Sequence, residues 1–114
     1  LEAITITLTN CTLSGNYASG SSFNRGGGIY NGSGFGGSTL QLRNSTLSGN
    51  SVSGGSSNQG GGIYNLAFQA NTLVEISSST IASNNASRGG GLDFAESSGG
   101  TVTVNLRNTI LAQN

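Results

Sequence analysis

The chain of 114 residues contains no proline, lysine, histidine, tryptophan or methionine, and it has one cysteine. Without histidine or paired cysteines it lacks the ligands of the usual zinc sites and the base of a histidine-dependent nucleophilic triad. A single cysteine cannot form an internal disulfide. No run of about 18 apolar residues occurs, so we expect no membrane insertion by this segment. The missing methionine leads us to expect a piece of a longer or processed chain.

Charged residues are also scarce and make up 7% of the chain. Four arginines balance four acidic residues. A basic stripe that could follow a phosphate backbone is therefore absent, and we expect no nucleic-acid partner. A net charge of zero also leaves little electrostatic protection against self-association.

The sequence contains an internal repeat, which is the signal to seek first. The segment 10–16 (Asn-Cys-Thr-Leu-Ser-Gly-Asn) returns at 44–50, 78–84 and 108–114, after 34, 34 and 30 residues. A Gly-Gly-Gly segment followed by an apolar residue starts at positions 26, 60 and 89. One unit cannot bury its own apolar face, whereas stacked units can. We treat 1–114 as a single domain with repeat units at roughly 1–25 (partial), 26–59, 60–88 and 89–114.

Each unit predicts three short strands. Alternating apolar and polar residues, as in 4–9, are typical of a strand, and no window has helical spacing of comparable quality. The Gly-, Ser- and Asn-rich segments 17–25, 32–38 and 51–59 are predicted to be loops. We therefore predict an all-β fold: a right-handed parallel β-helix, or β-solenoid, with three strands per rung and about 3.5–4 rungs.

Stacking also predicts which residues lie inside. Four apolar columns should form a narrow core: Ile29, Ile63, Leu92; Ile6, Leu40, Val74, Val104; Leu8, Leu42, Ile76, Leu106; and Leu13, Leu47, Ile81, Leu111. Asparagine occupies two further columns, which we interpret as structural hydrogen-bonded ladders with a spacing of about 4.8 Å. These columns are Asn10, Asn44, Asn108 (with Ser78), and Asn16, Asn50, Asn84, Asn114.

Two of these motifs resemble those of a known group. Gly27-Gly28-Ile29 and Gly61-Gly62-Ile63 are similar to a Gly-Gly-Ala-Ile motif, and segments such as 13–16 and 47–50 are similar to its partner, Phe-x-x-Asn. Both belong to right-handed parallel β-helix repeats of the pectate-lyase-like superfold, most of all those of polymorphic outer-membrane proteins and other large secreted bacterial proteins. The resemblance implies an extracellular or cell-surface location and a role in adhesion or extracellular structure.

The same superfold includes polysaccharide lyases and glycosidases, so we ask whether the acidic residues could form a catalytic site. A glycosidase needs two carboxylates within roughly 5–9.5 Å. Only Asp93 and Glu96 are near each other in sequence, and Asp93 and Glu75 fall at positions predicted to face outward. We expect no enzyme activity, no catalytic residue, no cofactor and no metal.

The expected function is therefore a structural or adhesive shaft, within a longer chain or an extracellular filament. Its ends would expose apolar residues without a cap, so we expect end-to-end self-association through further rungs or neighbouring subunits. Two alternatives stay open. One is a non-catalytic remnant or fragment of a polysaccharide-binding or polysaccharide-degrading β-helix protein. The other is an ice-binding solenoid, suggested by the column Thr12, Thr46, Thr80, which breaks at Ile110.

Overall fold

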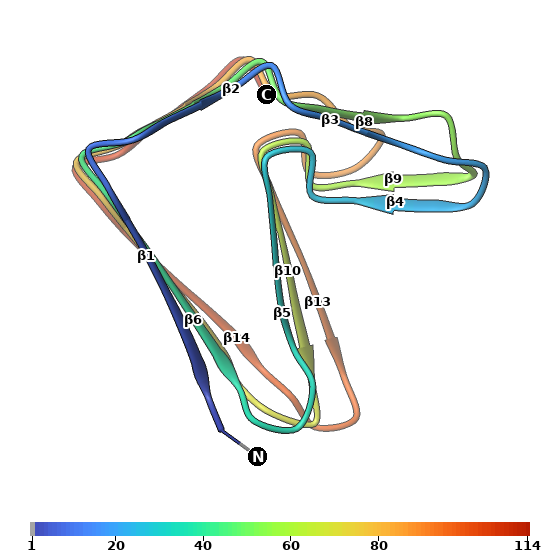
Figure 1. Cartoon of the computed structure of the whole chain (residues 1–114), viewed down its shortest axis with the longest axis vertical. Coiled ribbons are helices and arrows are strands. Elements are labelled where there is room, and N and C mark those ends of the chain that lie inside the picture. Colours follow the sequence, from blue (N-terminus) through green and yellow to red (C-terminus); the bar gives the residue numbers. More distant parts are fainter. Residues whose placement is uncertain (1) are drawn as a thin grey trace.

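The computed structural model describes residues 2–114, and within this range it contains strands and turns but no helix. The strands form five sheets, and every recorded pairing is parallel. In Figure 1 the chain winds clockwise as it recedes from the viewer, which makes the coil right-handed. The prediction of an all-β, right-handed parallel solenoid is confirmed.

Three coils and the start of a fourth follow one another along the chain. The first contains β1 (Ile4–Thr9), β2 (Thr12–Ser14), β3 (Tyr17–Ser19), β4 (Phe23–Arg25) and β5 (Ile29–Ser33). The second contains β6 (Ser38–Arg43), β7 (Thr46–Ser48), β8 (Ser51–Ser53), β9 (Ser57–Gln59) and β10 (Ile63–Phe68). The third contains β11 (Thr72–Ser77), β12 (Thr80–Ala82) and β13 (Leu92–Ser97), and β14 (Val102–Arg107) and β15 (Ile110–Ala112) begin the fourth.

Three sheets surround the core. Sheet 1 has the order β1-β6-β11-β14, sheet 2 the order β2-β7-β12-β15, and sheet 3 the order β5-β10-β13. Equivalent residues of successive coils are paired in register, so that Leu40 lies between Ile6 and Val74, and Ile63 lies between Ile29 and Leu92. This is the residue stacking that the repeat predicts.

A lateral arm is the main departure from the predicted rung. Segments 17–25 and 51–59, expected to be loops, form β3–β4 and β8–β9, which pair between the two coils and project sideways from sheets 2 and 3 (Figure 1). Val52 is buried inside this arm together with Asn24 and Asn58. The third coil has a shorter segment here and keeps only isolated bridges to the arm at Asn85 and Arg88. The sequence analysis missed these strands because their polar, glycine-rich composition is typical of turns and loops.

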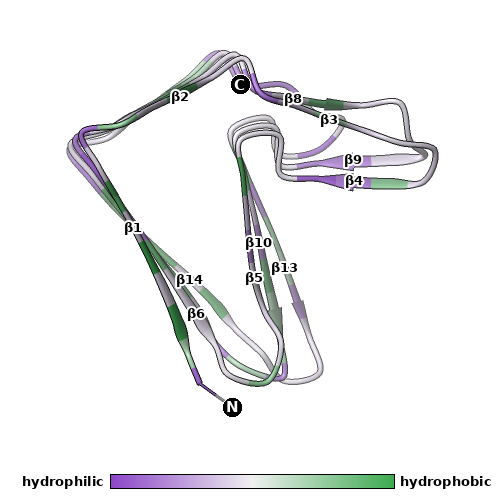
Figure 2. Cartoon of the chain, viewed as in Figure 1, coloured by the Kyte–Doolittle hydropathy of each residue, from purple (hydrophilic) through white to green (hydrophobic). Residues whose placement is uncertain are grey.

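The apolar columns occupy the space between the three sheets, and Figure 2 shows apolar stretches on their strands. The apolar side chains of the second and third coils are almost fully buried: Leu40, Leu42, Leu47, Ile63, Val74, Ile76 and Ile81. Ile29 of the first coil is also buried. Leu8, Leu13, Leu92 and Val104 pack against this cluster and are partly buried. The predicted core residues Ile6, Leu106 and Leu111 are instead exposed, because no coil of the described chain covers them.

The described segment is wider than it is long. Its extents are 35 × 34 × 16 Å, and the shortest dimension is the viewing direction of Figure 1, down the coil. Each end face is consequently large relative to the side wall. The described residues include no helix with the length and apolar character needed to cross a bilayer.

Candidate functional site: the asparagine ladder and the end faces

The inner ladder, consisting of Asn16, Asn50, Asn84 and Asn114, lies at the end of the sheet 2 strands. Asn50 Nδ2 donates to the Leu13 carbonyl oxygen at 3.0 Å and to Asn84 Oδ1 at 2.9 Å. Asn50 Oδ1 accepts from both the backbone nitrogen and Nδ2 of Asn16, at 3.0 and 2.9 Å. The hydrogen-bonding capacity of this buried amide is therefore filled, which removes the usual penalty for burying it.

Asn84 repeats the same pattern. Its Nδ2 donates to the Leu47 carbonyl oxygen and to Asn114 Oδ1, and its Oδ1 accepts from the backbone nitrogen and Nδ2 of Asn50. Among the described residues, no buried side-chain nitrogen or oxygen lacks a hydrogen-bond partner. The ladder thus links successive coils through both main-chain and side-chain donors.

The glycine triplets lie against this ladder. A Cβ atom at Gly62 would approach Asn84 Cγ to 3.3 Å, and one at Gly61 would lie 2.6 Å from the backbone nitrogen of Asn85. The first glycine of each triplet has the positive φ expected at this corner, for example 65° at Gly60. The two motifs that carry the family resemblance are therefore neighbours in space, and the small residues make room for the amides.

The other asparagine column has a different geometry from the one we predicted. Asn10, Asn44, Ser78 and Asn108 are exposed, at the corner between sheets 1 and 2, with φ between 48° and 57°. One amide–amide hydrogen bond occurs there, from Asn44 Nδ2 to Asn10 Oδ1 at 2.7 Å. Asparagine fits this column mainly because it tolerates the left-handed conformation, so the column is a backbone corner rather than a buried ladder.

Three polar columns escaped the sequence analysis. Asn31 Nδ2 donates to Asn65 Oδ1 inside sheet 3, and Asn24 Nδ2 donates to Asn58 Oδ1 inside the arm. Ser45 Oγ accepts from the backbone nitrogen of Cys11 at 3.1 Å, and Ser79 Oγ accepts from that of Ser45 at 3.1 Å. All three recur at the 34-residue step, which was the available signal. Cys11 takes the serine position in its column, where its Sγ donates to the Thr9 carbonyl oxygen.

The carboxylates of Glu75, Asp93 and Glu96 each accept a hydrogen bond from another residue. Asp93 was predicted to be an outward surface charge, but it is buried and its Oδ2 lies 2.9 Å from Arg88 Nε. Glu75 accepts a hydrogen bond from Gln41 Nε2, and Glu96 accepts one from the backbone nitrogen of Val102. Within residues 2–114, no group of three or more histidine, cysteine or acidic side chains is arranged to hold a metal ion.

Tyr64 is the neighbour of Asp93 on the adjacent strand of sheet 3. Both residues face outward from sheet 3, in register with Tyr30. The Arg25 guanidinium, from the arm, lies 5.2 Å from the centre of the Tyr64 ring, and the Tyr30 ring lies 5.5 Å from it. Burial raises the pKa of Tyr64 above 10.0, and the nearby Arg25 charge opposes part of that shift. The arm and sheet 3 therefore enclose a small second packed region outside the main core.

The hydrogen bonds between the asparagines of the inner ladder all run in one direction along the solenoid, so its first and last residues differ in what they leave unpaired. Each coil donates from its asparagine backbone nitrogen and Nδ2 to the Oδ1 of the following coil. At the N-terminal end face, formed by the open edges of β1, β2 and β5, Asn16 Oδ1 has no recorded donor within the described chain. At the C-terminal end face, formed by β13, β14 and β15, Asn114 has no following Oδ1 to receive its donors. The two faces thus have complementary chemistry.

Comparisons with protein-family models, curated proteins and solved structures find no match for this chain.

Proposed function

We propose that the chain is a structural or adhesive segment of a β-solenoid shaft in a secreted or cell-surface bacterial protein, with further coils covering both end faces. The directional asparagine ladder carries this proposal, because its two ends offer an acceptor and donors that another coil would satisfy. Exposed apolar side chains on the same faces, including Ile6 at 37% and Leu106 at 41% exposure, add a hydrophobic reason for continuation.

The resemblance to polymorphic outer-membrane protein repeats supports the location and the role. Its two motifs are Gly-Gly-Ile, as in 61–63, and Leu- or Ile-x-x-Asn, as in 81–84, and they pack together at one corner of the coil. Such a corner supports the stacking of successive coils. The extracellular location and the adhesive role follow from this analogy, which is an associational argument about the whole parent protein.

The strand count indicates what the next coil has to supply. Sheets 1 and 2 each contain four strands, whereas sheet 3 contains three. A second copy that paired its β1 with β14 would leave sheet 3 one strand short at the junction. A following segment with an arm and a Gly-Gly-Gly strand would fill that place. We therefore favour further coils of this kind over direct contact between two identical copies of residues 1–114.

A non-catalytic role is consistent with the engagement of the acidic side chains. Asp93 is held in an ion pair, and Glu96 caps the backbone of the turn before β14. Loss of either carboxylate should therefore affect stability. Assays on acidic and neutral polysaccharides test this part, and turnover that is lost in Asp93→Asn or Glu96→Gln would overturn it.

An extended chain tests the continuation. Residues 51–68 can be copied after Asn114, because Asn114 occupies the position of Asn50, which precedes Ser51. The extension supplies an arm and the missing strand of sheet 3. We expect the extended chain to have a higher Tm than the original and to associate end to end into rods, measured by sedimentation velocity and electron microscopy. A control extension of equal length made of glycine and serine should do neither. Equal Tm and monomers for both extensions would contradict the proposal.

A further inference from the structure

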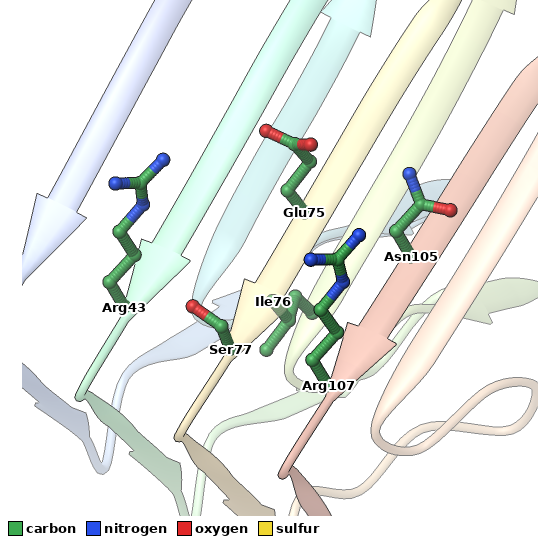
Figure 3. A pocket seen from close by; sticks show the side chains of 6 residues that line it. All are labelled: Arg43, Glu75, Ile76, Ser77, Asn105 and Arg107. Carbon is green, nitrogen blue, oxygen red and sulfur yellow. The ribbon is translucent and has the colours of Figure 1, made fainter.

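A hollow on the outward face of sheet 1 has the features of a ligand site. Register places Arg43, Ser77 and Arg107 in one column on β6, β11 and β14. The two arginines are two strand spacings apart, roughly 10 Å, and the small Ser77 between them leaves a hollow of about 250 Å³. Figure 3 shows the two guanidinium groups on either side of Ser77, with Glu75 and Asn105 beside them.

The two guanidinium groups have unused hydrogen-bonding capacity. The ion pair recorded among residues 2–114 joins Arg88 to Asp93, and no carboxylate of that range lies within 4.0 Å of a side-chain nitrogen of Arg43 or Arg107. Glu75 is the acidic residue that lines the hollow, and its Oε2 accepts from Gln41 Nε2 at 2.9 Å. A planar guanidinium binds a carboxylate through two parallel N–H donors, so two of them facing one hollow favour an oxyanion.

Glu75 and Asn105, which also line the hollow, limit the kinds of anion that would fit it. Two arginines and Glu75 give the hollow a net charge of about +1, which suits a monoanion better than a polyanion. Glu75 also provides a carboxylate that can accept from a hydroxyl group, and the Asn105 amide can both donate and accept. A bare anion would leave these groups without a partner.

We propose that the hollow binds a hydroxylated monocarboxylate of the sugar-acid type. Its carboxylate would lie between the Arg43 and Arg107 guanidinium groups, and its hydroxyls would pair with Glu75 and Asn105. The site lies on the outward face of sheet 1, and two of its residues, Asn105 and Arg107, belong to the edge strand β14. Because the arginines are exposed and exposed charge pairs contribute little, the dissociation constant should be in the millimolar range.

Saturation-transfer NMR observed on the ligand tests this, and it works whether the protein is monomeric or assembled. The probes are glucuronate, which has the charge and the hydroxyls, acetate, which has only the charge, and glucose, which has only the hydroxyls. We expect glucuronate to bind at least about fivefold more tightly than acetate or glucose, since the loss of one partly exposed polar contact has about this effect.

Three variants separate the hollow from general positive charge. Ser77→Leu fills the hollow without changing the charge and should abolish transfer to glucuronate. Arg43→Gln with Arg107→Gln should also abolish it. Arg88→Gln lowers the net charge by one at a distant place and should leave it unchanged. Circular dichroism checks that each variant remains folded.

Two outcomes would overturn the proposal. Equal binding of acetate and glucuronate would mean that a non-specific positive surface is present. Undiminished binding in folded Ser77→Leu would mean that the hollow is not the site. The same spectra with a short acidic peptide distinguish a protein partner, because tighter binding of the peptide than of glucuronate would also contradict the sugar-acid proposal.

Discussion

The middle coils and the end coils contain the same residue types in the same columns, yet their environments differ. Leu42 is completely buried, whereas Leu106, two strands further along the same sheet, is 41% exposed. Asn50 forms four side-chain hydrogen bonds, whereas Asn16 in the same ladder lacks a recorded donor to its Oδ1. In a solenoid, the contribution of a residue to stability thus depends on whether a coil lies on each side of it.

The largest contrast should come from truncating equivalent leucines. Leu42→Ala removes a fully buried side chain from the central core and should lower the free energy of unfolding by about 2–5 kcal/mol. Leu106→Ala should lower it by about 1 kcal/mol or less in a chain with open ends, because much of its side chain is already in water. Urea unfolding of both variants checks the difference. Equal losses would mean that the C-terminal end face is covered in solution.

The ladder should give the next largest contrast. Asn50→Ala leaves the Asn16 donors, the Leu13 carbonyl oxygen and part of the capacity of Asn84 Oδ1 unpaired, so we expect a loss of about 2–3 kcal/mol. Asn16→Ala leaves only Asn50 Oδ1 without donors from the Asn16 side chain, near an end face, and should cost about 1 kcal/mol. Chemical denaturation measures both values. A neutral Asn50→Ala variant would contradict a structural role for the ladder.

Glycine substitutions test the close approach of the coils. Gly61→Ala would place a Cβ atom 2.6 Å from backbone atoms of Asn85, so we expect destabilisation of about 1–3 kcal/mol. Gly34→Ala is the matched control, because a Cβ atom there meets nothing within 4 Å. Its Tm should change little. A Tm for Gly61→Ala that equals the control would show that the coils are further apart than described.

The smallest effect concerns the second packed region. Because the pKa of Tyr64 is higher in the folded chain than 10.0, the folded state holds this proton more tightly than the unfolded state. The free energy of unfolding should therefore be insensitive to this group below pH 10 and fall as the pH rises from there towards the folded pKa. Stability measured between pH 8 and 11 should fall less steeply in Tyr64→Phe. Identical slopes would contradict the raised pKa.

Much of the fold was predictable because the repeat is strict. Period-two alternation around Leu40 and Leu42 identified sheet 1 and its inward face, and the 34-residue step fixed the register. The arm was not predictable from the same criteria, because Ser57, Asn58 and Gln59 have no apolar alternation. Their strand forms by pairing with 23–25 of the previous coil. Similarly, sequence spacing could not distinguish the buried Asn50 column from the exposed Asn44 column, since the difference lies in backbone conformation.

The candidate surfaces were only partly accessible from sequence. The end faces followed from counting strands, but the Arg43–Arg107 hollow did not, because each arginine alone looks like ordinary surface charge. Its shape depends on the small Ser77 that the register places between them. The burial of Asp93 was missed for a related reason, since its partner Arg88 lies in the short segment that takes the place of the arm in the third coil. In both cases the repeat was identified correctly, but the spatial neighbours of the side chains could not be read from it.

Native-state hydrogen exchange tests the central claim most directly, namely that the end faces are completed by other coils. Amides of β6 and β11 should be strongly protected at every protein concentration. Those amides of the edge strands β1 and β14 that point away from the sheet should exchange quickly in the original chain at low concentration. The copy of residues 51–68 appended after Asn114 should slow their exchange as the ends pair. Strong protection of β1 and β14 in a dilute monomer, unchanged by the extension, would contradict the account.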